Sequence, residues 1–495
     1  MHARSRALPV DRRLLDHSLA TRGGRLPTGA SQRVGSGRDG RDAGGRRGRA
    51  RVTSSTVLLA ATIATILAVF AVFAAIGADA WWLAALGRVI VARHTIPVGV
   101  PFAAAPSAHW HNTLVLAALV FDGLERGVGD RGLMLAQLLA VGVAFTVLAR
   151  DAREEGASAA GASVALLVAA LGAFQSLAIA RVQLFSLALF PVLAALLRSE
   201  ERRPSRRIWL VVAVLALWAN LHGAALIGLL VTYVYLLFGR FRKDPRTAVA
   251  VALAATLAVC LTPALAGTVS YYHGVLTNVA AQRGVEQWAP LSLTSPFGDL
   301  AILAAVVLGW YAYRTRPRLW EVAGIVVLAV LTIRTGRSSV WLLFFLVAPA
   351  ARSLTPGAPR GRLVAAAIAL PLVLLAFAVV RGPISTSADE PLVPKAVALA
   401  HGSPVLAPDF LAERVALDGG RVWLSNPLDA FSHHDQAIYL DWVEGRRQGD
   451  AALTPSVRVV LVKRGSATAR LMVAARDFVL HAHDRTTLLY LRTRD

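Results

Sequence analysis

A single carboxylate stands where it could act on a substrate at a membrane surface. Asp79 follows an apolar run directly, in the stretch GADAWWLAALGRVI, and Trp81 and Trp82 come next. Paired tryptophans are typical of the membrane–water boundary, so we expect the carboxylate there. It could serve as a general base or bind a divalent ion such as Mg²⁺ or Mn²⁺. Composition alone favours the simpler reading, an acid at a helix end beside an aromatic belt.

Two arginines in apolar surroundings could hold an anion. Arg334 and Arg337 lie in RTGRSS (334–339), at a spacing that points both side chains the same way on a helix. The run 319–349 offers only Glu321 as an acidic partner, and a buried guanidinium usually has an anionic partner or faces water. The ligand could be a lipid phosphate or pyrophosphate, which a guanidinium binds in a bidentate manner. The alternative is that both side chains snorkel to a headgroup.

Polar residues interrupt two other apolar runs. Arg181 and Gln183, in IARVQLFS, fall at a predicted outer turn, and the arginine allows the same two readings. WANLHG (218–223) places Asn220 and His222 inside an apolar run, where a polar group needs a partner. These side chains either satisfy the backbone groups freed by a helix break, or face a cleft and bind sugar hydroxyls or phosphate.

The stretch HWHN (109–112) adds two histidines and an amide. His109 and His111 share a face in a strand but not in a helix. Together with Asp79 they could form a metal site, but interfacial histidines without a metal are more common, so we expect no zinc there. Asn112 completes the stretch as a candidate for substrate binding.

A second outer stretch, GVEQWAPLSLTSP (284–296), places Glu286 close to Trp288. A carboxylate beside an indole suits a sugar ring, and an ordinary interfacial loop is equally consistent. The sequence has no phosphate-cradling glycine loop, nucleophile elbow or Cys/His metal cluster, so soluble nucleotide chemistry has no obvious place.

The composition indicates a polytopic membrane protein. Of 495 residues 56% are hydrophobic, and the mean hydropathy is +0.55, too apolar for a soluble chain of this length. The net charge of +22 does not indicate nucleic acid, because the arginines concentrate in residues 1–53 and in short connections between apolar runs. Residues 1–53 read as a disordered basic tail, either purely topogenic or in contact with anionic membrane lipid. The connections follow the positive-inside pattern.

The apolar runs predict the membrane-spanning segments. Runs long enough for one span, about 20 residues, lie near 54–78, 131–149, 157–177, 182–198, 246–263, 298–313 and 363–381. Two longer runs, 208–238 and 319–349, are flanked at both ends by basic connections, so both ends should be cytoplasmic. We therefore expect each to form a pair of short helices that turn at WANLHG and RTGRSS; a single kinked, tilted helix is the alternative.

The expected architecture is a mainly α, polytopic membrane protein with about eleven transmembrane segments, two pairs of which form short hairpins. The N-terminus is then cytoplasmic, the membrane domain covers 54–381, and the outer loops cover 79–130 and 263–297. Residues 382–495 should form a small extracytoplasmic α/β domain. Its strands are expected in SPVLAPD, GRVWLSNPLDAF, VRVVLVKRG and DRTTLLYLRT, and its helix over 467–478.

The ordered set of motifs resembles the GT-C superfamily of membrane glycosyltransferases. The resemblance rests on DAWWLAALGRVIVARHTIPVGVPF, the following W-H-N, RVQLFSLALF, LWANLHGAALIGLL, EQWAPLSLTSP and RTGRSSVWLLFFLVAPAA, in that order. It implies transfer of a sugar from a polyprenyl-phosphate donor to a lipid, glycan or protein acceptor on the outer face of the bacterial inner membrane. In the family an acid just after the first helix is the catalytic carboxylate or metal ligand, and Asp79 occupies that place.

The resemblance also implies roles for the remaining candidates. Asp79 would deprotonate the acceptor hydroxyl, directly or through a divalent ion, and Arg334 and Arg337 would hold the departing polyprenyl phosphate. WANLHG would be the tip of a half-membrane hairpin that lines the donor cleft. The sequence departs from the family in having one acid instead of an Asp-x-Asp pair, TLVL instead of a Glu-Trp pair, and Val100 instead of an Asp. A non-catalytic member and a transporter of lipid-linked glycans therefore stay open as alternatives.

Overall fold

The structure, a computed structural model, describes residues 39–285, 288–355, 361–384 and 391–493. The chain divides into two compact units, Met1–Arg51 and Val52–Asp495, and the second unit holds the features discussed below. The predicted basic tail lies outside the described residues up to position 38, and the first helix, α1, begins within the rest of it.

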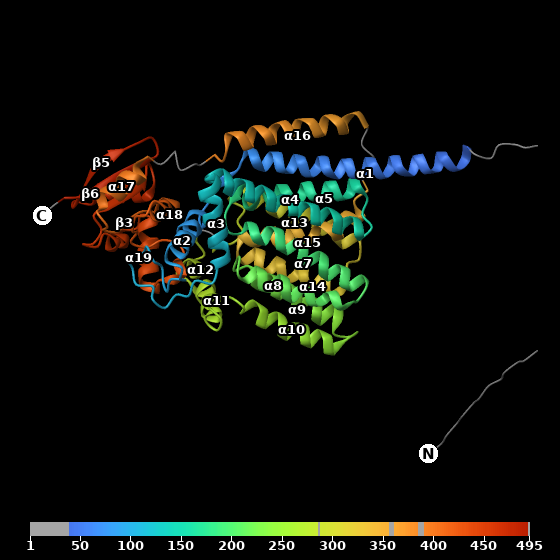
Figure 1. The fold of residues 1–495 in the computed structure, drawn as a ribbon, viewed down its shortest axis with the longest axis horizontal. Helices are drawn as coiled ribbons and strands as arrows, with labels where there is room; N and C mark the ends of the chain where they lie inside the picture. Colours follow the sequence, from blue (N-terminus) through green and yellow to red (C-terminus); the bar gives the residue numbers. More distant parts are fainter. Residues whose placement is uncertain (1–38, 286–287, 356–360, 385–390, 494–495) are drawn as a thin grey trace, which may run out of the picture. The chain divides into compact units, whose positions relative to one another are not determined.

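Apolar helices make up the larger part of the chain (Figure 1). Three of them, over Ser55–Val72, Asp130–Glu154 and Pro296–Arg314, are long and apolar enough to cross a membrane, and several shorter ones are apolar along their length. Each run predicted to span holds a helix. These helices are α1 (Asp39–Val72), α4 (Asp130–Glu154), α5 (Ala159–Gly172), α7 (Leu184–Arg202), α10 (Pro245–Val259), α13 (Pro296–Arg314) and α16 (Gly361–Arg381).

Both long runs break at the predicted turns. The first gives α8 (Leu210–Ala219) and α9 (Ala225–Tyr235), separated by WANLHG and followed by a π-helical turn, Leu236–Arg240. The second gives α14 (Leu319–Arg334) and α15 (Ser339–Ser353), joined by the 3₁₀ turn η4 (Gly336–Ser338). The two helices of each pair pack against one another. The expectation of two helices per run is therefore confirmed.

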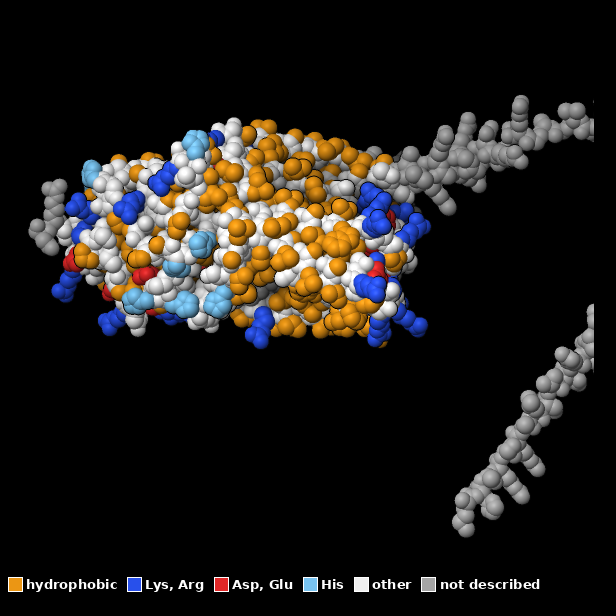
Figure 2. All heavy atoms as spheres, turned by 60° about the horizontal axis from the view of Figure 1, so that its bottom comes forward, with side chains coloured by type: hydrophobic (Ala, Val, Ile, Leu, Met, Phe, Trp, Pro, Cys, Tyr) orange, Lys and Arg blue, Asp and Glu red, His pale blue; other side chains and the backbone are white. Residues whose placement is uncertain are grey.

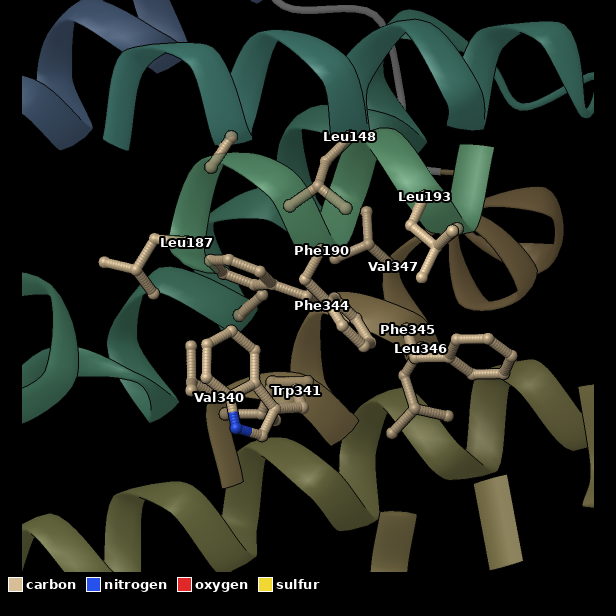
Figure 3. Packing of buried hydrophobic residues seen from close by; sticks show 14 of the residues in the cluster. Leu148, Leu187, Phe190, Leu193, Val340, Trp341, Phe344, Phe345, Leu346 and Val347 are labelled. Atoms are coloured by element: carbon tan, nitrogen blue, oxygen red, sulfur yellow. The ribbon is translucent and has the colours of Figure 1, made fainter. Parts of the chain in front are cut away.

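Helix α15 lies at the centre of the helical core. Every residue from Ser339 to Ala351 is buried, and the helix packs against α4, α5, α13 and α14. Figure 3 shows its aromatic and aliphatic side chains, Trp341, Phe344 and Phe345 among them, packed against α4 and α7. Its continuous apolar sequence, SVWLLFFLVAPA, suits this position because no side of the helix faces water.

The outer surface of the helices is apolar as well. Large hydrophobic side chains are exposed on many of them, for example Leu139, Leu257, Val306 and Phe377. Figure 2 shows these side chains as a broad band, with a cluster of Lys and Arg at one end of it and several histidines among further Lys and Arg towards the other. An exposed apolar belt of this extent is unfavourable in water and is expected of helices that face lipid.

The basic end of the helices contains buried ion pairs. Arg198 of α7 is fully buried and bonds Asp151 of α4 at 2.5 Å and Glu321 of α14 at 3.4 Å. The Glu155 side chain is almost as deeply buried and pairs with arginines at the ends of three neighbouring helices: Arg202 of α7, Arg318 at the start of α14 and Arg352 of α15. The arginines of the predicted basic connections thus lie at the same end of the bundle.

Short elements form the opposite end. The two-residue strands β1 (Ala75–Ile76) and β2 (Ile179–Ala180) pair in parallel, and they directly follow α1 and α6 (Phe174–Ala178). The predicted outer loops contain helices rather than only irregular chain: α2 (Ala80–Arg93), α3 (Val115–Val128), α11 (Gly267–Thr277) and α12 (Val279–Arg283).

The C-terminal segment forms a four-stranded mixed sheet with strand order β3-β4-β6-β5. Strand β3 pairs in parallel with β4, and the other neighbours are antiparallel. The strands are β3 (Val405–Leu406), β4 (Val459–Lys463), β5 (Phe478–His483) and β6 (Thr487–Arg492). The helices are α17 (Leu392–Ala400), α18 (Asp409–Leu417), α19 (His433–Val443) and α20 (Ala467–Ala474). Its buried residues belong to one cluster with those of α2 and α3.

Two expectations for this segment are wrong in part. GRVWLSNPLDAF forms no strand: Val422 makes only single bridges to Val405 and Ala103, and the chain then turns into the 3₁₀ helix η6 (Leu428–Ala430). Pro427 lacks the N–H that a continuing ladder needs. The helix expected over 467–478 ends at Ala474, and Phe478 begins β5.

Candidate active site

Asp79 and Arg181 meet because the short strands before them pair. β1 and β2 align Ala75 with Ile179 and Ile76 with Ala180, and the Gly77 amide donates to the Ala180 carbonyl at 3.0 Å. An ion pair follows, in which Arg181 Nη2 lies 2.8 Å from Asp79 Oδ2. A Cβ on Gly77 would lie 2.3 Å from the Ile179 side chain, so the close pairing requires glycine at this position.

Asp79 has an unusual backbone conformation. Its φ of 78° lies in the left-handed region, at the N-cap of α2, which costs free energy for a residue with a Cβ. Its amide donates to Glu413 of α18, at 2.8 Å to Oε1 and 3.0 Å to Oε2. Asn426 Nδ2 donates to the same Oε1 at 2.7 Å. The C-terminal segment thereby fixes the backbone from which the Asp79 side chain projects.

Glu413 is fully buried at the start of α2. Burial, followed by the negative charge of Asp79, raises the pKa of Glu413 to about 8, while the amide donors of Asp79, Trp82 and Asn426 act in the opposite direction. The free amides of Asp79 and Trp82 at the N-terminus of α2 donate to this carboxyl group, so the contact ties α18 to α2.

His222 reaches the same cluster from the WANLHG turn. Its Nδ1 lies 2.6 Å from Ser186 Oγ, which also accepts from Trp218 Nε1 at 2.6 Å. The charges of Asp79, Arg181 and Arg337 act on the His222 imidazole. The neighbouring Gly223 lets the turn approach α11, because a Cβ there would lie 2.8 Å from the Tyr271 hydroxyl.

Asn220 has a different role in the same turn, because it bonds backbone carbonyls. Its Nδ2 donates to the Ala216 carbonyl at 2.9 Å and to the Leu261 carbonyl at 2.7 Å. Both carbonyls lie near helix ends, where backbone acceptors lack partners within their own helix. The sequence left two roles open for these side chains: bonding backbone groups freed by a helix break, or facing a ligand-binding cleft. The geometry of Asn220 matches the first role and that of His222 matches the second.

Arg337 enters the cluster from η4. Its guanidinium stacks on the Trp288 ring, 3.8 Å from the centroid, and the charges of Arg181, Asp79 and Asp429 act on it. The Arg337 side chain is exposed to solvent. Arg334 is also exposed, but it ends α14 and forms no ion pair with another described residue.

The expectation that Arg334 and Arg337 point the same way is wrong. It assumed a continuous helix, whereas Thr335 between them is extended, with φ −143° and ψ 114°. The chain therefore changes direction after Arg334, and only Arg337 faces the other site residues.

Two residues of this region were not expected from the sequence. Asp429, in η6, accepts from Asn278 Nδ2 at 2.7 Å. Burial raises the pKa of Asp429 to about 6, whereas the Asn278 bond and the charge of Arg337 lower it. Tyr271 of α11 packs against Trp110, with ring centroids 5.3 Å apart, and the charges of Asp429 and Asp79 both reach its hydroxyl.

A pocket of about 300 Å³ adjoins Tyr271 and Asp429. His109 and His111 both line it, together with His273 of α11 and His433 of α19. His111 forms an antiparallel bridge with Val98, so the stretch is locally extended, the condition under which the two histidines share a face.

The remaining sequence candidates lie apart from this pocket or have other bonds. Asn112 Nδ2 donates to the Pro97 and Gly99 carbonyls at 2.7 and 2.9 Å, which folds the first outer loop on itself. Gln183 is the N-cap of α7, and its carbonyl accepts from the Leu187 amide at 3.0 Å. Glu286 falls outside the described residues.

The described residues offer no three-ligand site for a metal ion. Nowhere in 39–285, 288–355, 361–384 or 391–493 do three His, Cys, Asp or Glu side chains come together in a way that could hold one. Asp79 Oδ2 is already paired with Arg181. A site built from three protein ligands does not fit this arrangement.

The same fold is found in two solved structures. The crystal structure of ArnT from Cupriavidus metallidurans bound to undecaprenyl phosphate matches with a TM-score of 0.52 and 13% identity, over 88% of this chain and 97% of ArnT. The apo structure of the same protein matches with a TM-score of 0.50 and 13% identity, over 89% and 98%. No family model matches the sequence, and neither does a curated protein. The chain therefore shares the fold of ArnT, and the fold that the order of its motifs predicted is confirmed.

Proposed function

We propose that the chain is a membrane glycosyltransferase that moves a sugar from a polyprenyl-phosphate donor to an acceptor. One observation carries the proposal: Asp79, Arg181, His222 and Arg337 gather at the non-basic end of the helices, in a fold whose ArnT example holds undecaprenyl phosphate. Arginines are suited to an anionic phosphate, and a carboxylate beside them is suited to glycosyl transfer.

The proposed reaction takes place at the outer face of the bacterial inner membrane. The arginines that pair with Glu155 and Asp151 lie at one end of the helices, which the positive-inside rule assigns to the cytoplasm. The chain would then cross the membrane about eleven times, with hairpins at α8–α9 and α14–α15. The domain formed by 382–495 would be extracytoplasmic. The acceptor is a lipid, a glycan or a protein.

Donor binding would add a phosphate to the Asp79–Arg181 pair. A donor phosphate between Arg181 and Arg337 would bond both guanidiniums while Arg181 keeps its bond to Asp79, because a guanidinium has five N–H donors. Asp79, only partly buried with 27% of its side chain exposed, would then keep its negative charge close to the sugar. There it stabilises the positive charge that develops at the anomeric carbon in an oxocarbenium-like transition state. The proposed steps use Asp79 without a divalent ion, because its Oδ2 is paired with Arg181.

Transfer by the purified protein tests this function. Wild type and Asp79→Asn in nanodiscs would be compared with a panel of radiolabelled polyprenyl-phosphate sugars, with native membrane extract as the acceptor. Asp477→Asn serves as the matched control, because this carboxylate is 77% exposed in the C-terminal segment. We expect transfer by wild type and the control, and at least a 100-fold loss in Asp79→Asn.

The two alternatives predict different outcomes of this assay. A folded wild type that binds undecaprenyl phosphate yet transfers no sugar would be a transporter or a non-catalytic partner in the cell envelope. Movement of the labelled lipid between the leaflets of a liposome separates those two.

A further inference from the structure

We propose that Asp429, supplied by the C-terminal segment, is the base that accepts the proton of the acceptor hydroxyl, and that the pocket beside it binds a sugar acceptor. This inference rests on the proposed glycosyl transfer and deepens it. It reassigns proton removal, which the sequence placed on Asp79, and it narrows the acceptor to a hydroxyl-rich, water-facing molecule.

The position of Asp429 links two parts of the site. It lines the pocket of about 300 Å³, and its charge interacts with those of Arg337 and Asp79. Tyr271 also lies in the pocket wall, and the charges of both Asp429 and Asp79 act on its hydroxyl. An acceptor in the pocket would therefore place a hydroxyl between Asp429 and the sugar phosphate held by the arginines.

Asp79 is less suited to proton removal. Its Oδ2 is bonded to Arg181 at 2.8 Å, and an adjacent guanidinium stabilises a carboxylate and weakens it as a base. Asp429 has no ion pair with another described residue, and Asn278 Nδ2 orients its Oδ1 at 2.7 Å. Burial raises the pKa of Asp429 to about 6, so it is ionised at neutral pH and a stronger base than an ordinary carboxylate.

The pocket walls indicate what the acceptor is. Imidazoles come from the first outer loop, α11 and α19, a hydroxyl comes from Ser270, and the Trp110 and Tyr271 rings provide flat apolar faces. Sugar rings offer hydroxyls to such polar groups and apolar faces to aromatic rings, whereas an acyl chain would leave these groups unpaired. Figure 2 shows histidines on the face beside the apolar band, away from the basic end, where a water-soluble acceptor could reach them.

The proposed step balances as a single displacement. An acceptor oxygen attacks the anomeric carbon of the donor sugar and forms the new glycosidic bond. The bond from that carbon to the phosphate oxygen breaks, and its electron pair leaves with the polyprenyl phosphate, which Arg181 and Arg337 hold. The acceptor proton moves to the Asp429 carboxylate, and water later removes it.

The test compares transfer rates in the nanodisc assay, using a radiolabelled undecaprenyl-phosphate sugar that the wild type accepts. The membrane extract is split into a water-soluble glycan fraction and an organic-soluble lipid fraction. Asp429→Asn should transfer at least 100-fold more slowly, with an unchanged Kd for undecaprenyl phosphate, and added formate should restore part of the rate. His433→Ala, which removes an exposed imidazole from the pocket wall, should raise the KM for the glycan fraction and leave kcat within about threefold. Label should enter the glycan fraction.

A second measurement keeps the inference testable if Asp429→Asn fails to fold. The wild-type rate should rise with pH through about 6. Asn278→Ala should move that rise to higher pH, because the Asn278 bond lowers the pKa of Asp429. The other groups that face Asp429 are Arg337, Asp79, Tyr271 and the four pocket histidines, and Asn278→Ala leaves all of them in place. A rise that does not move contradicts the assignment.

Two further results would overturn it. If folded Asp429→Asn transfers within threefold of wild type, Asp79 and not Asp429 is the base. If label enters only the lipid fraction, the acceptor is not a water-soluble sugar. In both cases the wild type is still a glycosyltransferase. If the wild type transfers nothing, the proposed function fails, and this inference fails with it.

Discussion

The carboxyl group of Glu413 accepts two hydrogen bonds from the backbone amide of Asp79, at 2.8 and 3.0 Å, across a separation of 334 positions in the chain. Asp79 has a positive φ of 78°, and such a conformation persists only where its surroundings hold it. The C-terminal segment is therefore part of the candidate site, because it sets the direction in which the Asp79 carboxylate projects.

Replacing Glu413 should harm both stability and activity. Glu413→Ala leaves the Asp79 and Asn426 donors without their acceptor, and we expect a loss of about 2–3 kcal/mol in the free energy of unfolding. Transfer per folded molecule should also fall, because the Asp79 backbone is released. Thermal unfolding in nanodiscs and the transfer assay measure the two effects. Glu444→Ala, which removes a carboxylate paired with the half-exposed Arg446, should change neither.

Glu413 also makes stability depend on pH. Its pKa in the folded protein is raised to about 8, and that of an unfolded glutamate is about 4.3. The contribution to stability is then full below pH 4.3 and is lost as the pH rises through about 8. Unfolding temperatures should decline over this interval. In Glu413→Gln the decline between pH 6 and 8 should disappear, while Asp429, with a pKa raised to about 6, still contributes below pH 6. An unchanged slope above pH 6 would contradict this account.

Arg181 and Arg334 should differ in their effect on phosphate binding. Arg181→Ala removes a guanidinium beside Asp79, and the Kd for undecaprenyl phosphate should rise about 10–100-fold, as expected when a charge-assisted hydrogen bond is lost. Arg334→Ala should leave the Kd within about threefold, because this side chain is exposed at the end of α14. Fluorescence titration of the lipid into labelled nanodiscs measures both. An equal rise in the Kd for both variants would mean that Arg334 also binds the phosphate.

Much of the site could be predicted because it follows from the order of the apolar runs. Runs that alternate in direction bring every second connection to the same end of a bundle. Asp79, Arg181, His222 and Arg337 all lie in such connections, and the structure brings them together. The breaks at WANLHG and RTGRSS were predictable for the same reason, since polar residues and basic flanks interrupt an apolar pattern.

Glu413 and Asp429 could not be found in this way. They lie in a segment that follows the last membrane helix, and no spacing in its sequence shows how that segment packs on α2 and α11. The roles of Asn112 and Asn220 were equally hidden. A side-chain amide that bonds two backbone carbonyls looks the same in a sequence as one that binds a ligand, because only the fold places the carbonyls within reach.

The two polar residues of the WANLHG turn should respond differently to truncation. Asn220→Ala leaves the Ala216 and Leu261 carbonyls without their donor, so stability should fall by about 1–2 kcal/mol. His222→Ala leaves the helix ends intact but removes the imidazole next to the charged cluster, so turnover should fall while the unfolding temperature holds. Unfolding curves and initial rates on the same preparations distinguish the two. The reverse pattern would mean that His222 is the structural residue.

The buried ion pairs at the basic end should matter for stability alone. Arg198 is fully buried, lies 2.5 Å from Asp151 and 3.4 Å from Glu321, and donates to the Phe345 carbonyl at 2.7 Å. Arg198→Met leaves the buried Asp151 and Glu321 carboxylates without this cation, and we expect a loss of about 3–5 kcal/mol in the free energy of unfolding. Adding Asp151→Asn should recover part of it. Asp151 lies near one end of α4, and Asp130 lies at the other end, about 30 Å away. Asp130 accepts a hydrogen bond from Trp81 of α2.

Transfer per folded molecule should therefore stay close to wild type in Arg198→Met. Arg150→Met is the matched control: this arginine is 81% exposed and pairs with Glu154 on the same helix, so its loss should leave the unfolding temperature unchanged. A drop in turnover without a drop in stability would show that the basic end is coupled to the Asp79 site through α4 or α7, because these helices connect the two ends.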